Sequence, residues 1–137
     1  MPIINASKAF GYTDLQTTVY NQAESFLASA DIASRRLVSI GTDGRVATTP
    51  TSGSPRLVVG VAQNAITSGE VGNVIVEGVA EDVPFTGTAP AAGDLLTRSG
   101  ATAGAVAVAA SPNVGDVVGV AISAGSGGVV DVYVFKA

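Results

Sequence analysis

Apolar and polar residues alternate in short runs from about residue 36 to the end of the chain. A period of two places every second side chain on the same face of a β-strand, so this pattern predicts strands. Runs 36–40 and 45–49 flank the dipeptide Asp43-Gly44, which tolerates the positive φ angles of a tight hairpin. Turn residues separate the other runs, and about eight short strands are expected in all, the remainder at 56–62, 71–80, 94–98, 105–109, 117–121 and 129–136.

One apolar run occurs twice. The sequence Val-Val-Gly-Val-Ala at 58–62 returns letter for letter at 117–121, an offset of 59 positions. The same offset separates two further pairs of turn glycines: Gly41 and Gly100, and Gly69 and Gly128. A register shared by strands and turns indicates an internal duplication of a unit of about 40 residues, and units that small rarely bury a core alone. We therefore expect the two halves to complete one barrel or sandwich, with Gly60 and Gly119 at equivalent bends.

The pattern divides the chain into an arm and a β domain. The β domain covers 35–137, with one half at about 36–80, a linker at about 81–93 and a second half at about 94–137. Residues 1–34 lack the alternation and form an N-terminal arm. A helix starting near Thr13 is possible there, but 17–20 is a β-favouring run, so we favour an extended arm.

The amino-acid composition argues against several classes of function. Charged residues make up 13% of the chain, against about 25% in ordinary domains, which suggests a surface covered by copies of the chain or by a partner. The net charge of −4 argues against nucleic-acid binding. The absence of Cys and His excludes disulfides and Cys/His zinc sites. With no signal peptide and no apolar run long enough for a bilayer, we expect a soluble protein made in a cytoplasm, without a membrane partner.

The acidic residues do not form an obvious active site. Glu81 and Asp82 are adjacent, and neighbours on an extended segment point to opposite faces. Asp43 belongs to the hairpin turn. Three further carboxylates are scattered and would have to converge from separate loops to bind a cation: Asp94, Asp116 and Asp131. We predict no catalytic residue, no metal site and no cofactor.

Two other motifs have ordinary structural explanations. The run 125–128, Gly-Ser-Gly-Gly, lacks the spacing of a phosphate loop and is not followed by a helical pattern, so a hairpin turn is favoured. Arg35, Arg36 and Arg56 could form a small basic patch for an acidic partner, or could simply be solvated strand ends.

The order of features after residue 35 is that of a known family. A strand pair at 37–40 and 44–46 is followed by the first Val-Gly-Val-Ala strand, a polar spacer and a strand at 74–79. An Ala-Ala-Gly-Asp step at 91–94 and the second Val-Gly-Val-Ala with a closing strand complete it. This order resembles the small capsid decoration (cement) proteins of tailed bacteriophages and prophages. The resemblance covers roughly three quarters of the chain and does not extend to residues 1–34.

The resemblance implies an all-β, compact β-barrel or β-tulip-like protein that is not an enzyme. Such a protein forms a trimer on the outer capsid surface of the virion and holds neighbouring major capsid protein subunits together. The arm is then expected to reach capsid protein or a neighbouring subunit, with apolar anchors at Ile3, Ile4, Phe10, Tyr12 and Leu15.

Three alternatives remain. A tail, fibre or baseplate module could use the same Val/Gly repeats. A small carbohydrate- or ligand-binding barrel would need exposed aromatic residues, and the β domain offers only Phe85, Tyr133 and Phe135. A hydrolase using the scattered carboxylates is the weakest alternative.

Overall fold

Nine β-strands and no α-helix make up the part of the chain that the structure, a computed structural model, describes: residues 21–53, 57–110 and 116–135. The predicted all-β fold is confirmed. The strands are β1 (Gln22–Leu27), β2 (Arg36–Ile40), β3 (Val46–Thr48), β4 (Val58–Ala62), β5 (Val71–Pro84), β6 (Leu95–Arg98), β7 (Val106–Val108), β8 (Gly119–Ala121) and β9 (Val129–Val134).

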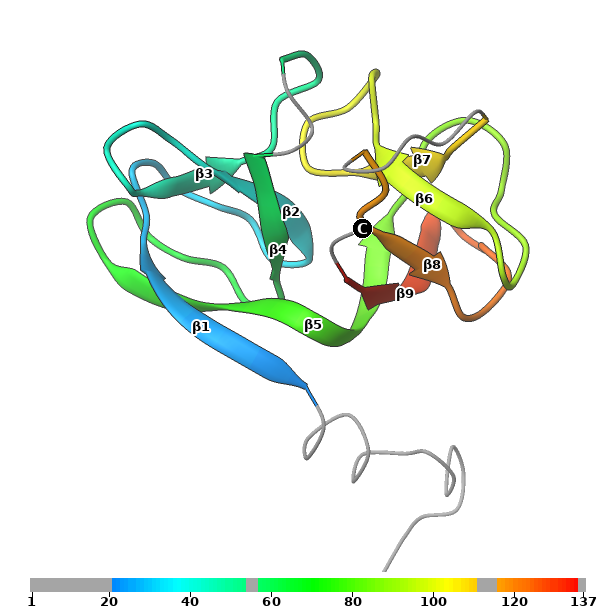
Figure 1. Cartoon of the computed structure of the whole chain (residues 1–137), viewed down its shortest axis with the longest axis horizontal. Coiled ribbons are helices and arrows are strands. Elements are labelled where there is room, and N and C mark those ends of the chain that lie inside the picture. The colour runs from blue at the N-terminus through cyan, green and yellow to red at the C-terminus, as the bar shows by residue number, and fades with distance from the viewer. Residues whose placement is uncertain (1–20, 54–56, 111–115, 136–137) are drawn as a thin grey trace, which may run out of the picture.

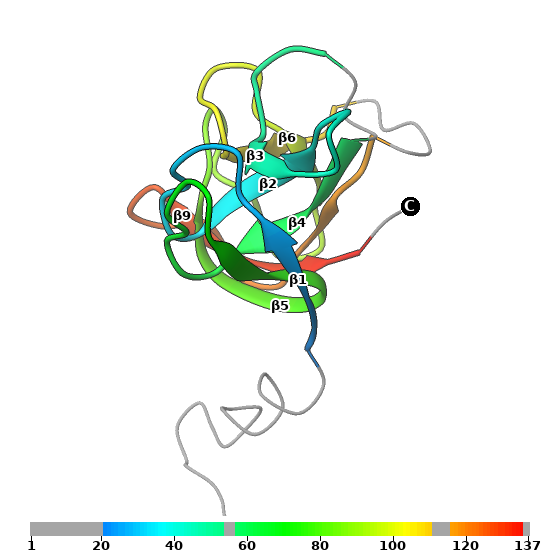
Figure 2. The same cartoon turned by 90° about the vertical axis from the view of Figure 1, so that its left-hand side faces the viewer.

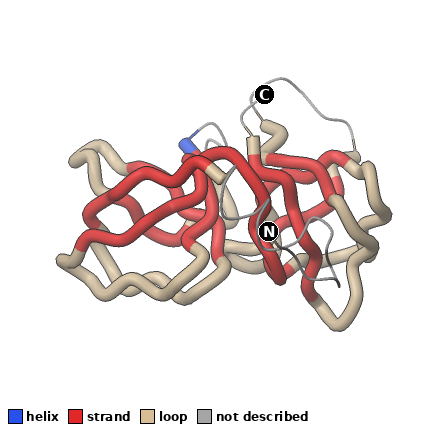
Figure 3. Tube along the Cα trace, turned by 90° about the horizontal axis from the view of Figure 1, so that it is seen from below, coloured by secondary structure: helices blue, strands red, loops and turns tan. Residues whose placement is uncertain are grey.

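The strands form one antiparallel sheet that curls into two lobes (Figure 1). Its order is β3-β2-β4-β5-β9-β8-β6-β7, with β1 paired to β5. The 14-residue strand β5 runs under both lobes and joins them. We call residues 22–77 lobe one, at the left of Figure 1, and residues 78–135 lobe two. Figure 2 looks onto lobe one, and Figure 3 shows the two lobes side by side from below.

The pairing register confirms that the halves are duplicated. Each lobe consists of a hairpin (β2–β3 or β6–β7), a strand beside it (β4 or β8) and a closing strand (the first part of β5, or β9). Residues of the repeated strand have equivalent partners in the two lobes: Val38 with Gly60 and Leu96 with Gly119, Val61 with Ile75 and Val120 with Tyr133.

The structural repeat is longer than the sequence pattern indicates. β1 pairs with the first part of β5 as the second part of β5 pairs with β9. Parallel bridges then curl each lobe, Ala28 with Val46 in lobe one and Phe85 with Val106 in lobe two. Residues 22–34, which we had assigned to the arm, therefore lie within lobe one, and β5 continues into the expected linker as far as Pro84. Because 22–27 form a strand, the helical alternative is wrong there.

Gly60 and Gly119 have the same role in the two lobes, as predicted. A Cβ on Gly60 would lie 2.1 Å from the carbonyl oxygen of Ile75, and one on Gly119 would lie 2.5 Å from that of Tyr133. Neither glycine has a positive φ angle. Glycine is required because a neighbouring backbone approaches too closely for any side chain.

Each lobe has a core of small aliphatic residues on the inner face of its sheet. The lobe-one core includes Val38, Val46 and Val74, and their lobe-two equivalents are Leu96, Val106 and Val132. The lobe-two cluster extends across the lobe boundary, because it also contains Leu37, Val61 and Ile75 of lobe one. The two lobes thus share part of one core, as a duplicated small unit requires.

Candidate interaction surfaces

Four of the six carboxylates that the sequence singled out have a hydrogen-bond or ion-pair partner: Asp43, Asp82, Asp94 and Asp131. Arg35 and Asp82 form an exposed ion pair at 2.9 Å that links the lobes, and both residues have positive φ angles of 63° and 55°. The backbone of Glu81, not its carboxylate, pairs with Gln63: its N–H donates to Gln63 Oε1 at 3.3 Å and its carbonyl oxygen accepts from Gln63 Nε2 at 3.2 Å. Glu81 and Asp82 thus do not act as a pair.

Three aspartates accept hydrogen bonds from backbone N–H groups, Asp43 and Asp94 within their own turns and Asp131 from β9 to β5. Asp43 accepts the N–H of Arg45 at 3.0 Å, which confirms its turn role. Asp94 accepts the N–H of Ala91 at 2.8 Å, and Asp131 accepts that of Asp82 at 3.0 Å. Among the residues that the structure describes, no three Asp, Glu, His or Cys side chains are grouped closely enough to hold a metal ion.

The glycine-rich run and two of the three arginines of the suggested basic patch have partners in the structure. The run 125–128 is a hairpin turn, as predicted: Ser126 N–H donates to Val129 O at 3.0 Å, and both Gly127 and Gly128 have positive φ angles. Of the suggested basic patch, Arg36 donates to Ser34 O at 3.0 Å and Arg35 faces Asp82. Arg56 lies outside the described residues, as do all five predicted arm anchors: Ile3, Ile4, Phe10, Tyr12 and Leu15.

The two lobes differ most on the outer face of the sheet, which is the face turned away from each lobe's core. In lobe one this face carries a row of three paired residues, Leu37, Val61 and Ile75, which we call the lobe-one outer row. All three are buried, with exposed fractions of 1%, 0% and 8%, because lobe two packs over them.

The equivalent residues of lobe two are open. They are Leu95, Val120 and Tyr133, which we call the lobe-two outer row. Leu95 is 39% exposed, and the other two are half-buried. The ring of Phe135 lies 6.1 Å from that of Tyr133 and extends the row towards the lobe boundary. The sequence analysis missed this surface, because the offset of 59 aligns Leu37 with Leu96 and only the strand register shows that Leu95 is its equivalent.

The β6–β7 turn, residues 99–105, docks where β2 begins and β3 ends. Leu37 N–H donates to Gly104 O at 2.8 Å, and Gly104 N–H donates to Thr49 O at 2.9 Å. A Cβ on Gly104 would lie 3.0 Å from Arg36 Cβ and 2.8 Å from Thr48 Cγ2. The turn is therefore pressed directly against β2 and β3.

A further contact fastens the lobes together. The guanidinium of Arg98 on β6 donates to the carbonyl oxygens of Thr51 and Gly53, at 2.7 Å for Gly53, in the loop after β3. Its Nε is buried and has no hydrogen-bond partner among the residues that the structure describes. The position equivalent to Arg98 in lobe one is Ile40, so this clamp exists in one direction only.

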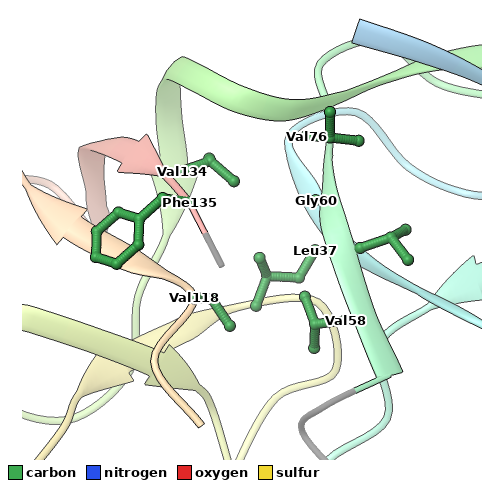
Figure 4. A pocket seen from close by; sticks show the side chains of 8 residues that line it. Leu37, Val58, Gly60, Val76, Val118, Val134 and Phe135 are labelled. Carbon is green, nitrogen blue, oxygen red and sulfur yellow. The ribbon is translucent and has the colours of Figure 1, made fainter. Parts of the chain in front are cut away.

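A narrow apolar groove marks the boundary between the lobes (Figure 4). The side chains that converge on it carry no charge: Leu37, Val58, Val59, Val76, Val118, Val134 and Phe135, beside Gly60. Without a polar group to orient a ligand, this groove does not favour the carbohydrate- or ligand-binding alternative.

Tyr133 is the titratable residue of the lobe-two outer row. Its hydroxyl donates to Glu77 Oε2 at 3.2 Å. The negative charge of Glu77 raises the pKa of Tyr133, and desolvation and the hydrogen bond act in the same direction. Tyr133 therefore stays neutral and presents an aromatic ring with a fixed hydroxyl on this face.

Four large apolar side chains are well exposed in the described part of the chain: Leu57, Val71, Leu95 and Ile122. Leu57 shares a shallow depression with Gly41 and Arg45 of the β2–β3 turn, residues 41–45. None of the described segments is a helix long and apolar enough to cross a membrane.

Comparison with known proteins gives a family and similar solved structures. A family model described as phage cement protein matches residues 21–135. The solved structure of the head fiber gp8.5 N base in bacteriophage phi29 is similar, with a TM-score of 0.56 at 18% sequence identity. That alignment covers 82% of this chain and 92% of the other. A search of the curated proteins gives no match.

Proposed function

The chain belongs to the phage cement protein family, and on that premise we propose that it binds the outer surface of a phage head and stabilises contacts between major capsid protein subunits. The coarser conclusion, a structural protein of the phage virion head, follows from the family itself. The match to residues 21–135 carries the proposal, because it spans both lobes and all nine strands.

The structural similarity supports a head location. The similar structure is described as part of a head fiber, so its fold serves a phage head. This favours the head over a tail or baseplate position among the alternatives.

The surface of the protein supports a binding role without catalysis. Three aspartates are held by backbone groups and Asp82 by Arg35, and the boundary groove is apolar. The exposed large residues are aliphatic, and charged residues are few. A protein with such a surface is best suited to contact other proteins. We propose that this protein functions as a homotrimer.

The N-terminal segment is proposed to anchor the trimer. Ile3, Ile4, Phe10, Tyr12 and Leu15 would contact capsid protein or a neighbouring subunit. The segment leads directly into β1, whose first four residues are exposed and which pairs with β5 along one side. An extended segment entering such a strand is well placed to add to a sheet of the capsid.

Co-sedimentation tests this function directly. Purified protein is mixed with empty heads assembled without it, and its mass in solution is measured by light scattering. We expect a trimer that pellets with the heads to a fixed, saturable occupancy. A protein that stays in the supernatant at all concentrations would refute the cement function.

Deletion of residues 2–12 tests the arm. The shortened chain should keep its β-sheet circular dichroism and its unfolding transition, because the described lobes begin at residue 22. It should no longer bind undecorated heads. Unchanged occupancy would show that the arm is not the anchor, with the cement function itself still supported by the full-length chain.

A further inference from the structure

The lobe-two outer row is an open apolar strip across the sheet of lobe two. Leu95 is 39% exposed, and Val120 and Tyr133 are half-buried. The strand register continues the strip onto β5, where Val79 pairs with Tyr133 and is also half-buried. Paired residues of an antiparallel sheet project from the same face, so the strip crosses four strands and is about 14 Å wide.

Two aromatic rings lie at this strip. Tyr133 and Phe135, which we call the aromatic pair, are two residues apart along β9 and its continuation, with ring centroids 6.1 Å apart. Both are half-buried, and the Tyr133 hydroxyl is fixed by its hydrogen bond to Glu77. In Figure 4 the ring of Phe135 lies on the side of the boundary groove where β8 and β9 are. Such a pair offers ring surface to a further aromatic side chain.

The edge of β5 next to β1 is closed by two side-chain amides. Asn21 Nδ2 donates to Val79 O at 3.1 Å, and Val79 N–H donates to Asn21 Oδ1 at 2.7 Å. Gln63 binds the backbone N–H and carbonyl oxygen of Glu81 in the same way. The backbone groups with which an upstream extension of β1 would pair are therefore already occupied. Residues 1–20 need a partner other than this edge.

The start of β1 is directed away from the body of the molecule. Figure 1 and Figure 2, a quarter turn apart, both show it beyond β5, pointing away from the two lobes. Tyr133 of the same chain is only one strand spacing, about 5 Å, from Val79. Nine extended residues, from Asn21 back to Tyr12, span about 30 Å. In the extended form that we predict for this segment, Tyr12 reaches a neighbouring molecule without folding back.

The sequence of the segment suits an apolar, aromatic surface. Residues 1–20 contain three of the seven aromatic residues of the chain: Phe10, Tyr12 and Tyr20. Phe10 and Tyr12 are two residues apart, as the members of the aromatic pair are, so both project from one face of an extended segment. The family model begins at residue 21, so this segment is additional to the lobes that the family shares.

Charge also favours this segment as the occupant. Its formal charge is zero, because Lys8 and Asp14 cancel, so residues 21–137 carry the whole net charge of −4. Two acidic residues flank the lobe-two outer row, Glu77 at the hydroxyl of Tyr133 and Asp94 beside Leu95. An acidic lobe of a second copy would be repelled there, whereas a neutral segment is not.

We propose that the N-terminal segment of one copy docks on the lobe-two outer row of a neighbouring copy, with its Phe-Gly-Tyr run, residues 10–12, against the aromatic pair. The proposal rests on the self-association in the proposed function and names the surface of the neighbouring subunit that receives the segment. Ile3 and Ile4 lie six or more residues further upstream and stay available for capsid protein.

The exchange of segments fixes the kind of assembly. Each copy donates one segment and receives one, which is a heterologous, head-to-tail contact. Such contacts either close into rings or grow into filaments. The proposed homotrimer would then be a closed ring in which each chain holds the next.

Site-specific photocrosslinking tests the contact without assuming a register. A photoreactive p-benzoylphenylalanine replaces Tyr12, which keeps an aromatic ring, and the purified chain is mixed with ¹⁵N-labelled wild-type protein. After irradiation, alone and on heads, mass spectrometry maps each link. We expect links from the unlabelled segment to β8 or β9 of labelled chains. The same group in place of Ile3 is the matched control, and it should link to capsid protein on heads but not to the row.

Three results would overturn the contact. They are links from position 12 only within the same chain, links only to capsid protein, and links only to lobe one of the labelled chain. If wild-type protein is a trimer that pellets with heads but no link to β8 or β9 of another chain forms, the contact is wrong and the cement function stands. A wild-type chain that is monomeric and ignores heads would instead refute the proposed function.

Substitutions within the segment separate the contact from folding, because both lobes lie after residue 20. Phe10→Ser/Tyr12→Ser should raise the dissociation constant of self-association about tenfold or more, measured by analytical ultracentrifugation, with the unfolding transition unchanged. Ile3→Ser/Ile4→Ser removes two apolar side chains of the same segment and should leave self-association unchanged. Equal effects of the two variants would contradict the assignment of residues 10–12.

A matched pair of substitutions tests the receiving surface. Val120→Asp places a charge beside Tyr133 and should weaken self-association about tenfold or more. Val71→Asp, at a side chain 64% exposed in lobe one, should not. Combining Val120→Asp with Phe10→Ser/Tyr12→Ser should weaken self-association little beyond either alone, because both disrupt one contact. Fully additive losses would mean that the segment and the row act at separate sites.

Discussion

The two lobes have the same strand pairing but not the same surroundings. Leu37 and Leu95 occupy equivalent positions, and their exposed fractions are 1% and 39%. Ile75 is buried, whereas its equivalent Tyr133 is half-buried and directs its hydroxyl to Glu77. A duplicated unit placed beside its copy keeps its inner core and can bury only one of its two outer faces. The second face remains for another molecule.

Two further pairs of equivalent residues differ between the lobes because only one member of each pair makes a contact to the other lobe. Arg98 of lobe two clamps the loop after β3, and its lobe-one equivalent is the apolar Ile40. Arg35 adopts a positive φ angle and pairs with Asp82, while its equivalent in lobe two is Gly93. Both hydrogen-bond a carbonyl of the repeated strand, Ala62 for Arg35 and Ala121 for Gly93. Residues at equivalent positions of the two lobes therefore differ where their surroundings differ, although the strand pairing around them is the same.

The largest effect on the free energy of unfolding is expected at Gly60 and Gly119, where the two lobes are most alike. Gly60→Ala and Gly119→Ala would each force a neighbouring backbone to move, and we expect each to lower the free energy of unfolding by about 4 kcal/mol or more. Urea unfolding measures this. Gly100→Ala is the control, because its Cβ would meet nothing and its φ is not positive, and it should be nearly neutral. Similar stabilities for all three variants would contradict the close backbone approach at Gly60 and Gly119, and a loss at only one of the two would contradict the equivalence of the two strands.

Truncating the leucine of each outer row should lower the stability by different amounts. Leu37→Ala creates a cavity between the lobes and should cost about 3 kcal/mol of unfolding free energy. Leu95→Ala should cost less than about 1 kcal/mol when measured at a concentration where the chain is monomeric. Equal losses in denaturant titrations would mean that the two rows have the same environment, contrary to their exposure.

A smaller effect is expected at the left-handed positions. Gly93→Ala, at a φ of 94°, should lose about 1 kcal/mol of unfolding free energy because a Cβ is unfavourable there. Arg35→Gly relieves the same conformational cost but loses an exposed ion pair and makes the unfolded chain more flexible. We expect its stability to stay within about 1 kcal/mol of wild type. A large loss in thermal or urea unfolding would show that the ion pair matters more than exposed pairs usually do.

The smallest effect concerns pH. Because the folded-state pKa of Tyr133 is raised, the contribution of its bond to Glu77 is fully present below the tyrosine pKa of the unfolded chain and is lost as pH rises through the folded-state pKa. Glu77→Gln should lower the pKa of Tyr133 towards its ordinary value. Tyrosinate absorbance, with Tyr133→Phe subtracted to remove the other two tyrosines, measures it. An unchanged titration would exclude Glu77 as the cause.

Much of the fold could be predicted from the sequence, because alternation and turn glycines are local signals. The Val-Val-Gly-Val-Ala echo located β4 and β8 and their shared register. The limits of the repeat could not be found this way, since β1 has no sequence echo in the second part of β5 and is defined only by its pairing. The open outer row was also missed, because Leu95 and Leu37 look identical in sequence and differ only in what covers them. The arm anchors remain predictions.

One measurement tests the cement assignment most directly: cryo-electron microscopy of empty heads, assembled without this protein and then incubated with it. We predict two-lobed density on the outer surface, in groups of three. Heads whose outer surface carries no added density at saturating protein would contradict the account.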